Sequence, residues 1–273
     1  METVIVTTLV IGGIGLFIGL FLEMAAIRFK VEIDSKEEKI LNALPHINCG
    51  GCGYSLCSGL AAAIVKGSAP VNSCPVGGEI TSKKIAFIME TKVTNQRKMA
   101  AYVHCQGNSD VVKEEYEYTG VENCLMMAYV PNQGPKACNY GCLGFGSCVK
   151  VCPFDAIHIV KRIAVVDKKK CRACKKCIAV CPKKLISLEP VDVIYDKKHH
   201  DIQGAGAIVT CNSIDQSSET TNVCEVGCTS CGICKKVCPS NAIIIQNNLA
   251  SINQDKCTKC GLCKEKCPKK TIC

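Results

Sequence analysis

Three cysteine runs with a single spacing constrain this chain more than any other feature. They span 171–182, 228–239 and 257–268, and each reads C-x2-C-x2-C-x3-C-P. In this spacing three thiolates hold one [4Fe–4S] cluster and the fourth reaches a neighbouring cluster. The runs therefore predict a series of iron–sulfur clusters, and with it a chain that carries electrons.

The cysteine pattern also argues against the two other common uses of many cysteines. Disulfide scaffolds occur in short secreted chains, usually with an even cysteine count, whereas this chain has 273 residues and 25 cysteines. Structural zinc also uses C-x2-C, but in two separated pairs. A third cysteine three residues on, followed by C-P, favours a cubane cluster, with zinc and disulfides as the lesser alternatives.

Composition fits a folded, reduced, intracellular protein with a small core, because aromatic residues make up 5 % and tryptophan is absent. The formal charge of +9 counts every cysteine as neutral. A [4Fe–4S] cluster with four thiolates carries roughly −2 when oxidised, so six clusters would bring the chain to about −3. Lysines beside the runs then compensate for cluster charge. They lack the interleaved aromatics of a nucleic-acid site, so no nucleic-acid partner is expected.

The N-terminus predicts one membrane helix. Thr3 to Leu22 is uncharged, and about twenty apolar residues suffice to cross the hydrocarbon core. Arg28 and Lys30 follow it, whereas the short N-terminus offers only Glu2, so the positive-inside rule places the body in the cytoplasm. A cleaved signal peptide is the alternative, but its basic start and small-residue cleavage site are missing. We expect a single-pass protein of the cell membrane, anchored by residues 1–27.

Residues 28–90 predict a small iron–sulfur domain. Ser35-x2-Glu38 is a capping-box pattern that opens a short helix before Pro45, and a second helix is expected from Leu56 to Lys66. Four cysteines in this domain match one [4Fe–4S] site, with a zinc knuckle as the alternative. They are Cys49, Cys52, Cys57 and Cys74.

Residues 91–190 and 191–273 read as two copies of one module, since most of their cysteines recur at an offset of 86 residues. Each copy carries a predicted hairpin, 156–160 with 163–166 and 242–246 with 249–252, between two cysteine runs. The predicted fold class is therefore α+β. It comprises a transmembrane helix, a four-cysteine Fe–S domain and two bacterial-ferredoxin-like 2[4Fe–4S] modules.

Crossing the fourth ligand between neighbouring clusters, as in two-cluster ferredoxins, gives the expected ligand sets and a total of at least five [4Fe–4S] clusters. For the first module they are Cys138, Cys142, Cys148 and Cys181 for one cluster and Cys152, Cys171, Cys174 and Cys177 for the other. For the second module they are Cys228, Cys231, Cys234 and Cys267, and Cys238, Cys257, Cys260 and Cys263.

Five cysteines remain after this assignment. A sixth cluster would use four of them and leave only Cys273 at the terminus. No local spacing enforces that cluster, and buried structural cysteine is the alternative. Its expected ligands are Cys105, Cys124, Cys211 and Cys224.

The sequence shows no catalytic constellation. Gly141, Gly144 and Gly146 lie among the cluster ligands, without the strand–turn–helix unit of a dinucleotide fold. We therefore expect no catalytic residue and no substrate-reducing site in this chain.

The order of these parts resembles a known family. A membrane helix, CGGCGYSLC from Cys49, GPKACNYGCLGFGSCVKVCPFDAI from Gly134 and a second ferredoxin module are similar to the B subunit of Rnf complexes. Those are membrane-bound ferredoxin–NAD oxidoreductases that couple electron flow to Na⁺ or H⁺ transport. The resemblance covers nearly the whole chain. With its second ferredoxin module, the chain is similar to the long form of the B subunit in anaerobic bacteria such as clostridia and acetogens.

The resemblance implies that soluble ferredoxin docks on this subunit as electron donor. It also implies that other membrane and peripheral subunits of the complex hold flavins and NAD, while the coupling ion is not encoded here. Two other classes stay open. One is a membrane-anchored polyferredoxin of a hydrogenase or other reductase, which need not carry the module of Cys49 to Cys74. The other is a cluster-based redox or oxygen sensor, which would need an output domain.

Overall fold

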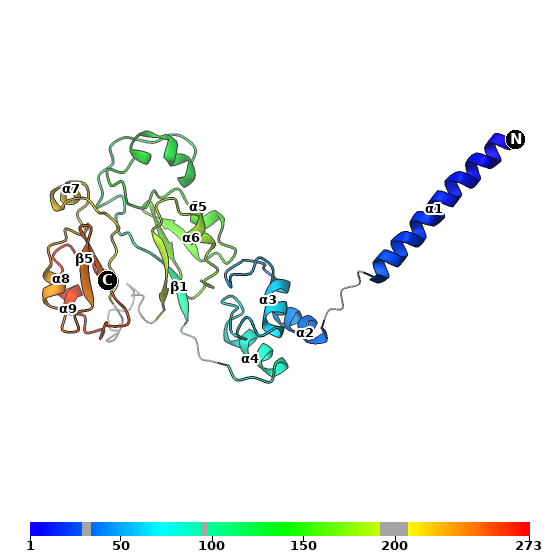
Figure 1. Cartoon of the computed structure of the whole chain (residues 1–273). Coiled ribbons are helices and arrows are strands. Elements are labelled where there is room, and N and C mark those ends of the chain that lie inside the picture. The colour runs from blue at the N-terminus through cyan, green and yellow to red at the C-terminus, as the bar shows by residue number, and fades with distance from the viewer. Residues whose placement is uncertain (29–33, 94–97, 192–206) are drawn as a thin grey trace.

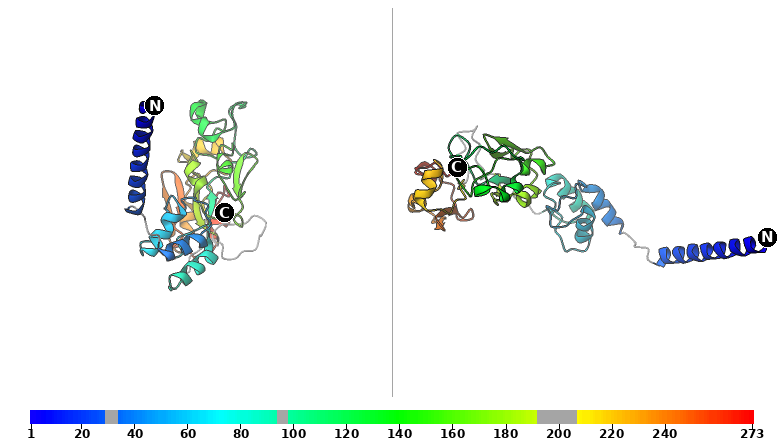
Figure 2. Two further views of the ribbon diagram at one scale, coloured as in Figure 1. Left: turned by 90° about the vertical axis from the view of Figure 1, so that its right-hand side faces the viewer. Right: turned by 90° about the horizontal axis from the view of Figure 1, so that it is seen from above.

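The structure is a computed structural model that describes residues 1–28, 34–93, 98–191 and 207–273. The N-terminal helix stands apart from three small bodies, which follow one another in chain order with the first ferredoxin-like module in the middle (Figures 1 and 2). Lys30, one of the two basic residues behind the predicted orientation, lies outside the described residues.

Helix α1 spans Glu2–Arg28 and contains the predicted apolar stretch. Within the described residues it is the one helix long and apolar enough to cross a membrane, over Ile5–Ala25 with a hydropathy of 2.5 and no part buried. Leu16, Phe17 and Phe21 are all more than half exposed. A helix that is apolar all round suits a lipid environment rather than one face of a soluble core.

The Fe–S domain is built from three helices: α2 (Ser35–Ala43), α3 (Cys57–Val65) and α4 (Gly78–Ile88). Ile40, Leu60, Ile64 and Ile85 pack between them and are almost fully buried. The two predicted helices are confirmed, but the cap is not Ser35. Asp34 caps α2, because its side chain accepts a hydrogen bond of 2.8 Å from the Lys36 N–H.

The first module holds two antiparallel strand pairs. The predicted hairpin is confirmed, and a second pair joins segments that are far apart in the sequence. In this pair Ala101 lies opposite Leu188, and it closes the core of the module. The elements are β1 (Met99–Val103), α5 (Ser147–Lys150), β2 (Ile157–Val160), β3 (Ile163–Val166), α6 (Lys176–Val180) and β4 (Ile186–Pro190).

An insertion between β1 and α5 carries two 3₁₀ helices, η1 (Cys124–Tyr129) and η2 (Pro131–Gln133). Its backbone joins the two modules. The N–H of Lys113 donates to Val223 of the second module at 3.0 Å, and the carbonyl of Lys113 accepts from Ala137 at 2.9 Å. The segment around Lys113 therefore lies between the chain before Cys138 and the chain before Cys224.

The second module repeats the hairpin and the short helices of the first. Ile243 and Ala250 from its hairpin pack with Ile272 near the C-terminus. Its elements are α7 (Ser217–Val223), α8 (Ile233–Lys236), β5 (Ile243–Gln246), β6 (Leu249–Ile252) and α9 (Leu262–Glu265).

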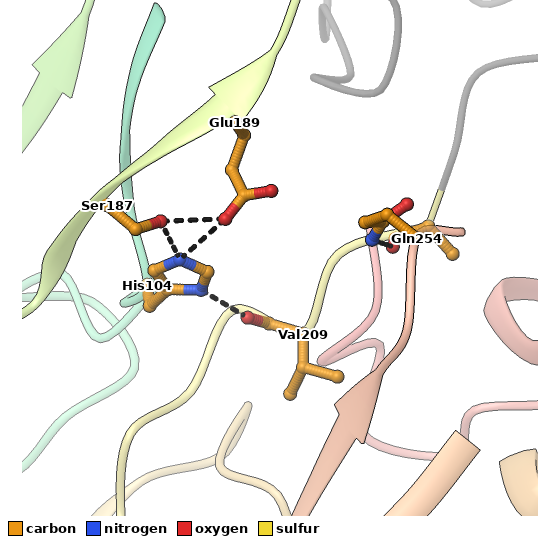
Figure 3. Close-up of polar contacts among 6 residues, drawn as sticks. His104, Ser187, Glu189, Val209 and Gln254 are labelled. Atoms are coloured by element: carbon orange, nitrogen blue, oxygen red, sulfur yellow. Dashed lines mark hydrogen bonds and ion pairs between the residues drawn. The ribbon is translucent and has the colours of Figure 1, made fainter. Parts of the chain in front are cut away.

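His104, just after β1, connects the two modules (Figure 3). Its Nδ1 donates to the Val209 carbonyl of the second module at 3.0 Å, and its Nε2 lies 2.7 Å from Ser187 Oγ on β4. Hydrogen bonds from His104 and Ser187 hold the pKa of Glu189 below its usual value. These contacts fix the chain that runs from Val209 into Cys211.

Candidate iron–sulfur sites

All 25 cysteines lie in the described part of the chain, each as a free thiol. Of these, 24 fall into six groups, which are called sites 1 to 6 in their order from helix α1. Among the described residues no three His, Cys, Asp or Glu side chains converge as single-ion ligands would. The cysteines of sites 3 to 6 instead stand around cavities of about 310 to 400 Å³. These cavities offer space for a multi-atom group rather than one ion.

Sites 5 and 6 lie in the second module, and the structure brings together the cysteines that the spacing predicts for them. Site 5 encloses about 390 Å³ between Cys228, Cys231, Cys234 and Cys267. Site 6 encloses about 310 Å³ between Cys238, Cys257, Cys260 and Cys263. In both sites the chain reverses around three closely spaced cysteines, and the fourth comes from the other run of the module.

Site 3, in the first module, differs from the expected set. Its cavity of about 360 Å³ is lined by Cys124, Cys142, Cys148 and Cys181, and Cys138 is not among them. Burial raises the pKa of the Cys148 thiol to about 12, and the nearby thiols of Cys142 and Cys124 raise it further. Cys124 thus lines site 3 in the place where the spacing expected Cys138.

The reason for this exchange is one residue of the repeat. Phe145 stands where the second module has Cys231, so the run that builds site 3 lacks one local cysteine. Phe145 is buried beneath the insertion, with its ring 5.4 Å from the ring of Tyr118 and packed in the same cluster as Cys124. The Cys124 N–H also donates to Ser147 Oγ of α5 at 2.9 Å. Phe145, which takes the position of a cysteine ligand, therefore packs against the insertion that supplies Cys124 to the same site.

Site 4 also differs from the expected set in the residues that line it. The expected sixth set contained Cys124, but the structure places Cys138 with the other three. A cavity of about 400 Å³ is lined by Cys105, Cys138, Cys211 and Cys224. Sequence reasoning missed this because the four cysteines come from four separate stretches, brought together by the backbone pairing around Lys113.

Sites 1 and 2 face each other. In site 2 the thiols of Cys171, Cys174 and Cys152 surround Cys177, and burial followed by these thiols raises its pKa to about 12. In site 1 the thiols of Cys52 and Cys57 lie near Cys74. Their fourth expected partner, Cys49, lies close enough to raise the pKa of Cys174, although burial is the larger cause.

The contact between the Fe–S domain and the first module is close because Gly51 has no side chain. A Cβ at Gly51 would lie 3.2 Å from the Cα of Cys174 and 3.3 Å from its carbonyl oxygen. A larger residue would push site 1 away from site 2.

The donor set at these sites fits iron–sulfur clusters. Backbone N–H groups point at sulfur in several sites: Ala101 at Cys171 (3.3 Å), Gly77 at Cys74 (3.3 Å) and Ala242 at Cys238 (3.3 Å). Such bonds favour the thiolate, whereas burial and crowding raise the pKa of most of the buried thiols. Four crowded, buried thiolates are stable only with a positively charged partner, and cluster iron supplies that charge.

The six sites form a continuous series, because each shares a close contact or a common core with the next. Cys49 of site 1 lies near Cys174 of site 2, and Cys177 of site 2 lies near Cys148 of site 3. Further contacts lead through site 4 to site 5, and the residues of sites 5 and 6 share one core.

Exposure distinguishes the two ends of the series. Cys231 of site 5 and Cys260 of site 6 are exposed. Cys174 in site 2, the counterpart of Cys260, is 8 % exposed, because the Fe–S domain covers it. The second module thus presents its sites to solvent, and the first module does not.

Family models match three parts of the chain. A model for an Fe–S cluster matches residues 44–76. Models described as 4Fe-4S dicluster domains match residues 170–242 and 227–272. Iron–sulfur models therefore match the region of site 1, the last cysteine run of the first module and most of the second module.

Curated relatives extend over nearly the whole chain. The B subunit of the ion-translocating oxidoreductase complex of Methanosarcina acetivorans is 39 % identical over 94 % of this chain and 93 % of its own length. The B subunit of the Na(+)-translocating ferredoxin:NAD(+) oxidoreductase complex of Acetobacterium woodii is 38 % identical over 94 % and 73 %. The B subunit of the proton-translocating ferredoxin:NAD(+) oxidoreductase complex of Clostridium ljungdahlii is 35 % identical over 93 % and 86 %.

Proposed function

The chain belongs to the family of B subunits of ion-translocating ferredoxin:NAD⁺ oxidoreductase (Rnf) complexes, and we propose that it takes electrons from soluble ferredoxin and relays them to the membrane subunits. The observation that carries this proposal is the series of sites, which begins in the domain that follows the N-terminal helix along the chain and ends at solvent-exposed cysteines. The coupling to Na⁺ or H⁺ belongs to the complex, whose relatives carry both names.

Five of the sites are proposed to hold [4Fe–4S] clusters: sites 1, 2, 3, 5 and 6. When bound, such clusters supply one-electron carriers whose potentials depend on hydrogen bonds to sulfur and on solvent exposure. The chain contributes the thiolates, the N–H donors and the burial. At site 3 the ligands are Cys124, Cys142, Cys148 and Cys181.

The second module is proposed as the place where ferredoxin docks. Exposed lysines surround its exposed cysteines, among them Lys235, Lys236 and Lys266, with Asp255 and Glu265 as the nearby exposed acids. A cationic face steers an acidic electron-transfer protein toward it and raises the association rate at low salt. Electrons would then leave through site 1, next to the anchor in sequence.

The membrane orientation is also a proposal. We propose that α1 spans the cell membrane once, with the cluster-bearing body in the cytoplasm, because Arg28 and Lys30 follow the apolar stretch. Protease added to intact, right-side-out cells should leave the body undigested. Ready digestion under these conditions would reverse the orientation.

The test of the relay is the Cys52→Ala variant in the assembled complex, with Cys273→Ala as matched control because Cys273 lines none of the cavities of sites 3 to 6. Loss of one thiolate destroys a cubane or alters its type and potential. Ferredoxin should still reduce the second module, while electron delivery to the membrane partners falls sharply. If Cys52→Ala supports full ferredoxin-dependent NAD⁺ reduction, site 1 lies off the route.

A further inference from the structure

Site 4 lies between the modules and belongs to neither ferredoxin run. Cys105 follows β1 of the first module, and Cys138 lies at the end of the insertion. Cys211 and Cys224 come from the second module, ahead of its first run. None of the family models extends over Cys105 or Cys138.

The cavity of site 4 has the size of the cavities beside it. Together with the adjoining solvent space it measures about 400 Å³, against about 360 Å³ for site 3 and about 390 Å³ for site 5. Gly107 lines this cavity, and a Cβ on it would make ordinary contacts with Cys105 Sγ at 3.6 Å and Cys224 Sγ at 3.7 Å. A cubane-sized group therefore has the same room here as in the ferredoxin-type sites.

Each of the four sulfurs in site 4 accepts at least one backbone N–H. Cys142 donates to Cys105 Sγ at 3.3 Å, and Ser213 donates to Cys211 Sγ at 3.5 Å. Cys138 and Cys224 receive N–H groups from the residues that follow them. Buried structural cysteine needs no such donors, whereas thiolate ligands of a cluster are stabilised by them.

A buried cation stands beside the site. Lys136 is only 2 % exposed, and its Nζ donates to the carbonyls of Gly107 at 2.7 Å and Arg162 at 2.8 Å. A buried ammonium is costly unless negative charge lies nearby. The sulfurs of Cys105 and Cys142 lie near this ammonium, so a thiolate-bound cluster in site 4 would place negative charge beside it.

Site 4 also connects its neighbours. The hydrogen bond from Cys142 to Cys105 joins it to site 3. The Cys228 N–H donates to Cys211 and joins it to site 5. Without a redox group in site 4, no electron carrier would lie between site 3 of the first module and site 5 of the second module.

We infer that site 4 binds a sixth [4Fe–4S] cluster, held by Cys105, Cys138, Cys211 and Cys224, which joins the two ferredoxin modules into one electron-transfer chain. Binding of this cluster is a property of the isolated chain and needs no partner. Its role as a link rests on the proposed function.

The first test counts iron and sulfide in the full-length chain, purified anaerobically. Six cubanes give about 24 irons per chain. Cys138→Ala and Cys211→Ala should each affect one site, and the double variant Cys138→Ala/Cys211→Ala should lose no more than either single variant. The double variant Cys124→Ala/Cys211→Ala should lose twice as much, because its cysteines serve sites 3 and 4.

Electron paramagnetic resonance accompanies the count, since a cubane that loses one ligand can remain as a three-iron form. One altered site is expected for the first double variant and two for the second. Additive losses in Cys138→Ala/Cys211→Ala would overturn the ligand set. A total of about 20 irons in the unaltered chain, or zinc at this site, would overturn the cluster.

A second pair of variants leaves every thiol in place. Gly107→Val projects methyl groups into the cavity, whereas Gly107→Ala makes only ordinary contacts at 3.6 Å and serves as control. Gly107→Val should lose about four irons and keep the signals of the other five clusters, which also shows that it folds. Full iron content in Gly107→Val would contradict a cluster in this cavity. None of these readouts needs ferredoxin or membrane partners, so their failure is distinct from failure of the relay.

Discussion

Residues 144–184 and 230–270 follow the same backbone path but lie in different surroundings. Each of the eight residues with left-handed backbone in the first stretch recurs 86 positions later. Gly144 and Gly146 have φ of 79° and 72°, and their counterparts Ser230 and Gly232 have 46° and 78°. The hairpin turn at Lys161-Arg162 likewise matches Asn247-Asn248.

The modules differ in what covers this shared backbone. Around the first, the Fe–S domain covers Cys174 and the insertion covers Phe145. Around the second, the equivalent residues Cys260 and Cys231 are exposed. One repeat is thus enclosed, which fits the proposed internal relay, while the other exposes two cysteines, which fits the proposed docking of a soluble electron donor.

The largest expected effect tests the exchange of ligands in the first module. Cys124→Ala should remove the site 3 cluster and about four irons. Adding Phe145→Cys should restore the cluster, because Gly144 and Gly146 already hold the backbone that aims Cys231 in the second module. Iron analysis and electron paramagnetic resonance check both variants. If Cys124→Ala keeps all its iron, Cys124 is not a ligand and Cys138 regains that place.

A smaller effect is expected from the buried lysine between sites 3 and 4. Lys136→Met removes a positive charge that favours the reduced, more negative cluster, so the potential of site 4 should become more negative. An interaction of about 1.4 kcal/mol corresponds to about 60 mV for one electron, and a shift on that order is expected in a redox titration. Lys113→Met, at an exposed position of the same insertion, should change nothing. A shift toward positive potential would contradict the assigned role of Lys136.

The smallest effect is expected when one surface lysine is neutralised at equivalent positions of the two modules. Lys236 and Lys150 occupy the same place in the repeat, and both are exposed. Lys236→Gln should slow reduction by ferredoxin roughly two- to fivefold at low ionic strength and less at high salt. Lys150→Gln should leave that rate unchanged in the same stopped-flow measurement. Equal slowing by both variants would mean that ferredoxin does not prefer the second module.

Local spacing predicted the parts of this chain whose partners are close in sequence. The hairpins of both modules and the cysteine groups of sites 5 and 6 lie where the spacing predicts them. The β1–β4 pair was not predicted, because its strands lie at opposite ends of the first module in the sequence. Helix α4 was missed because Gly77 and Gly78 open it, and Thr81 and Ser82 occupy buried positions in it.

The exchange of Cys124 and Cys138 has the same origin. Five residues separate Cys142 from Cys148, whereas Cys231 lies between the matching Cys228 and Cys234, so the sequence indicates that a local cysteine is missing. It could not show which distant cysteine replaces it, because that depends on the packing of Phe145 with the insertion and on the backbone bonds of Lys113. Spacing shows that a ligand is missing, and only the fold shows which residue supplies it.

The most direct test of the account is the order in which the sites receive electrons. Reduced ferredoxin would be mixed with the full-length chain and with its Cys211→Ala variant, and samples frozen at successive times would be examined by electron paramagnetic resonance. The account predicts that the second module is reduced at the same rate in both, whereas the first module and site 1 are reduced promptly only in the unaltered chain. Equally fast reduction of site 1 in Cys211→Ala would show that electrons bypass site 4.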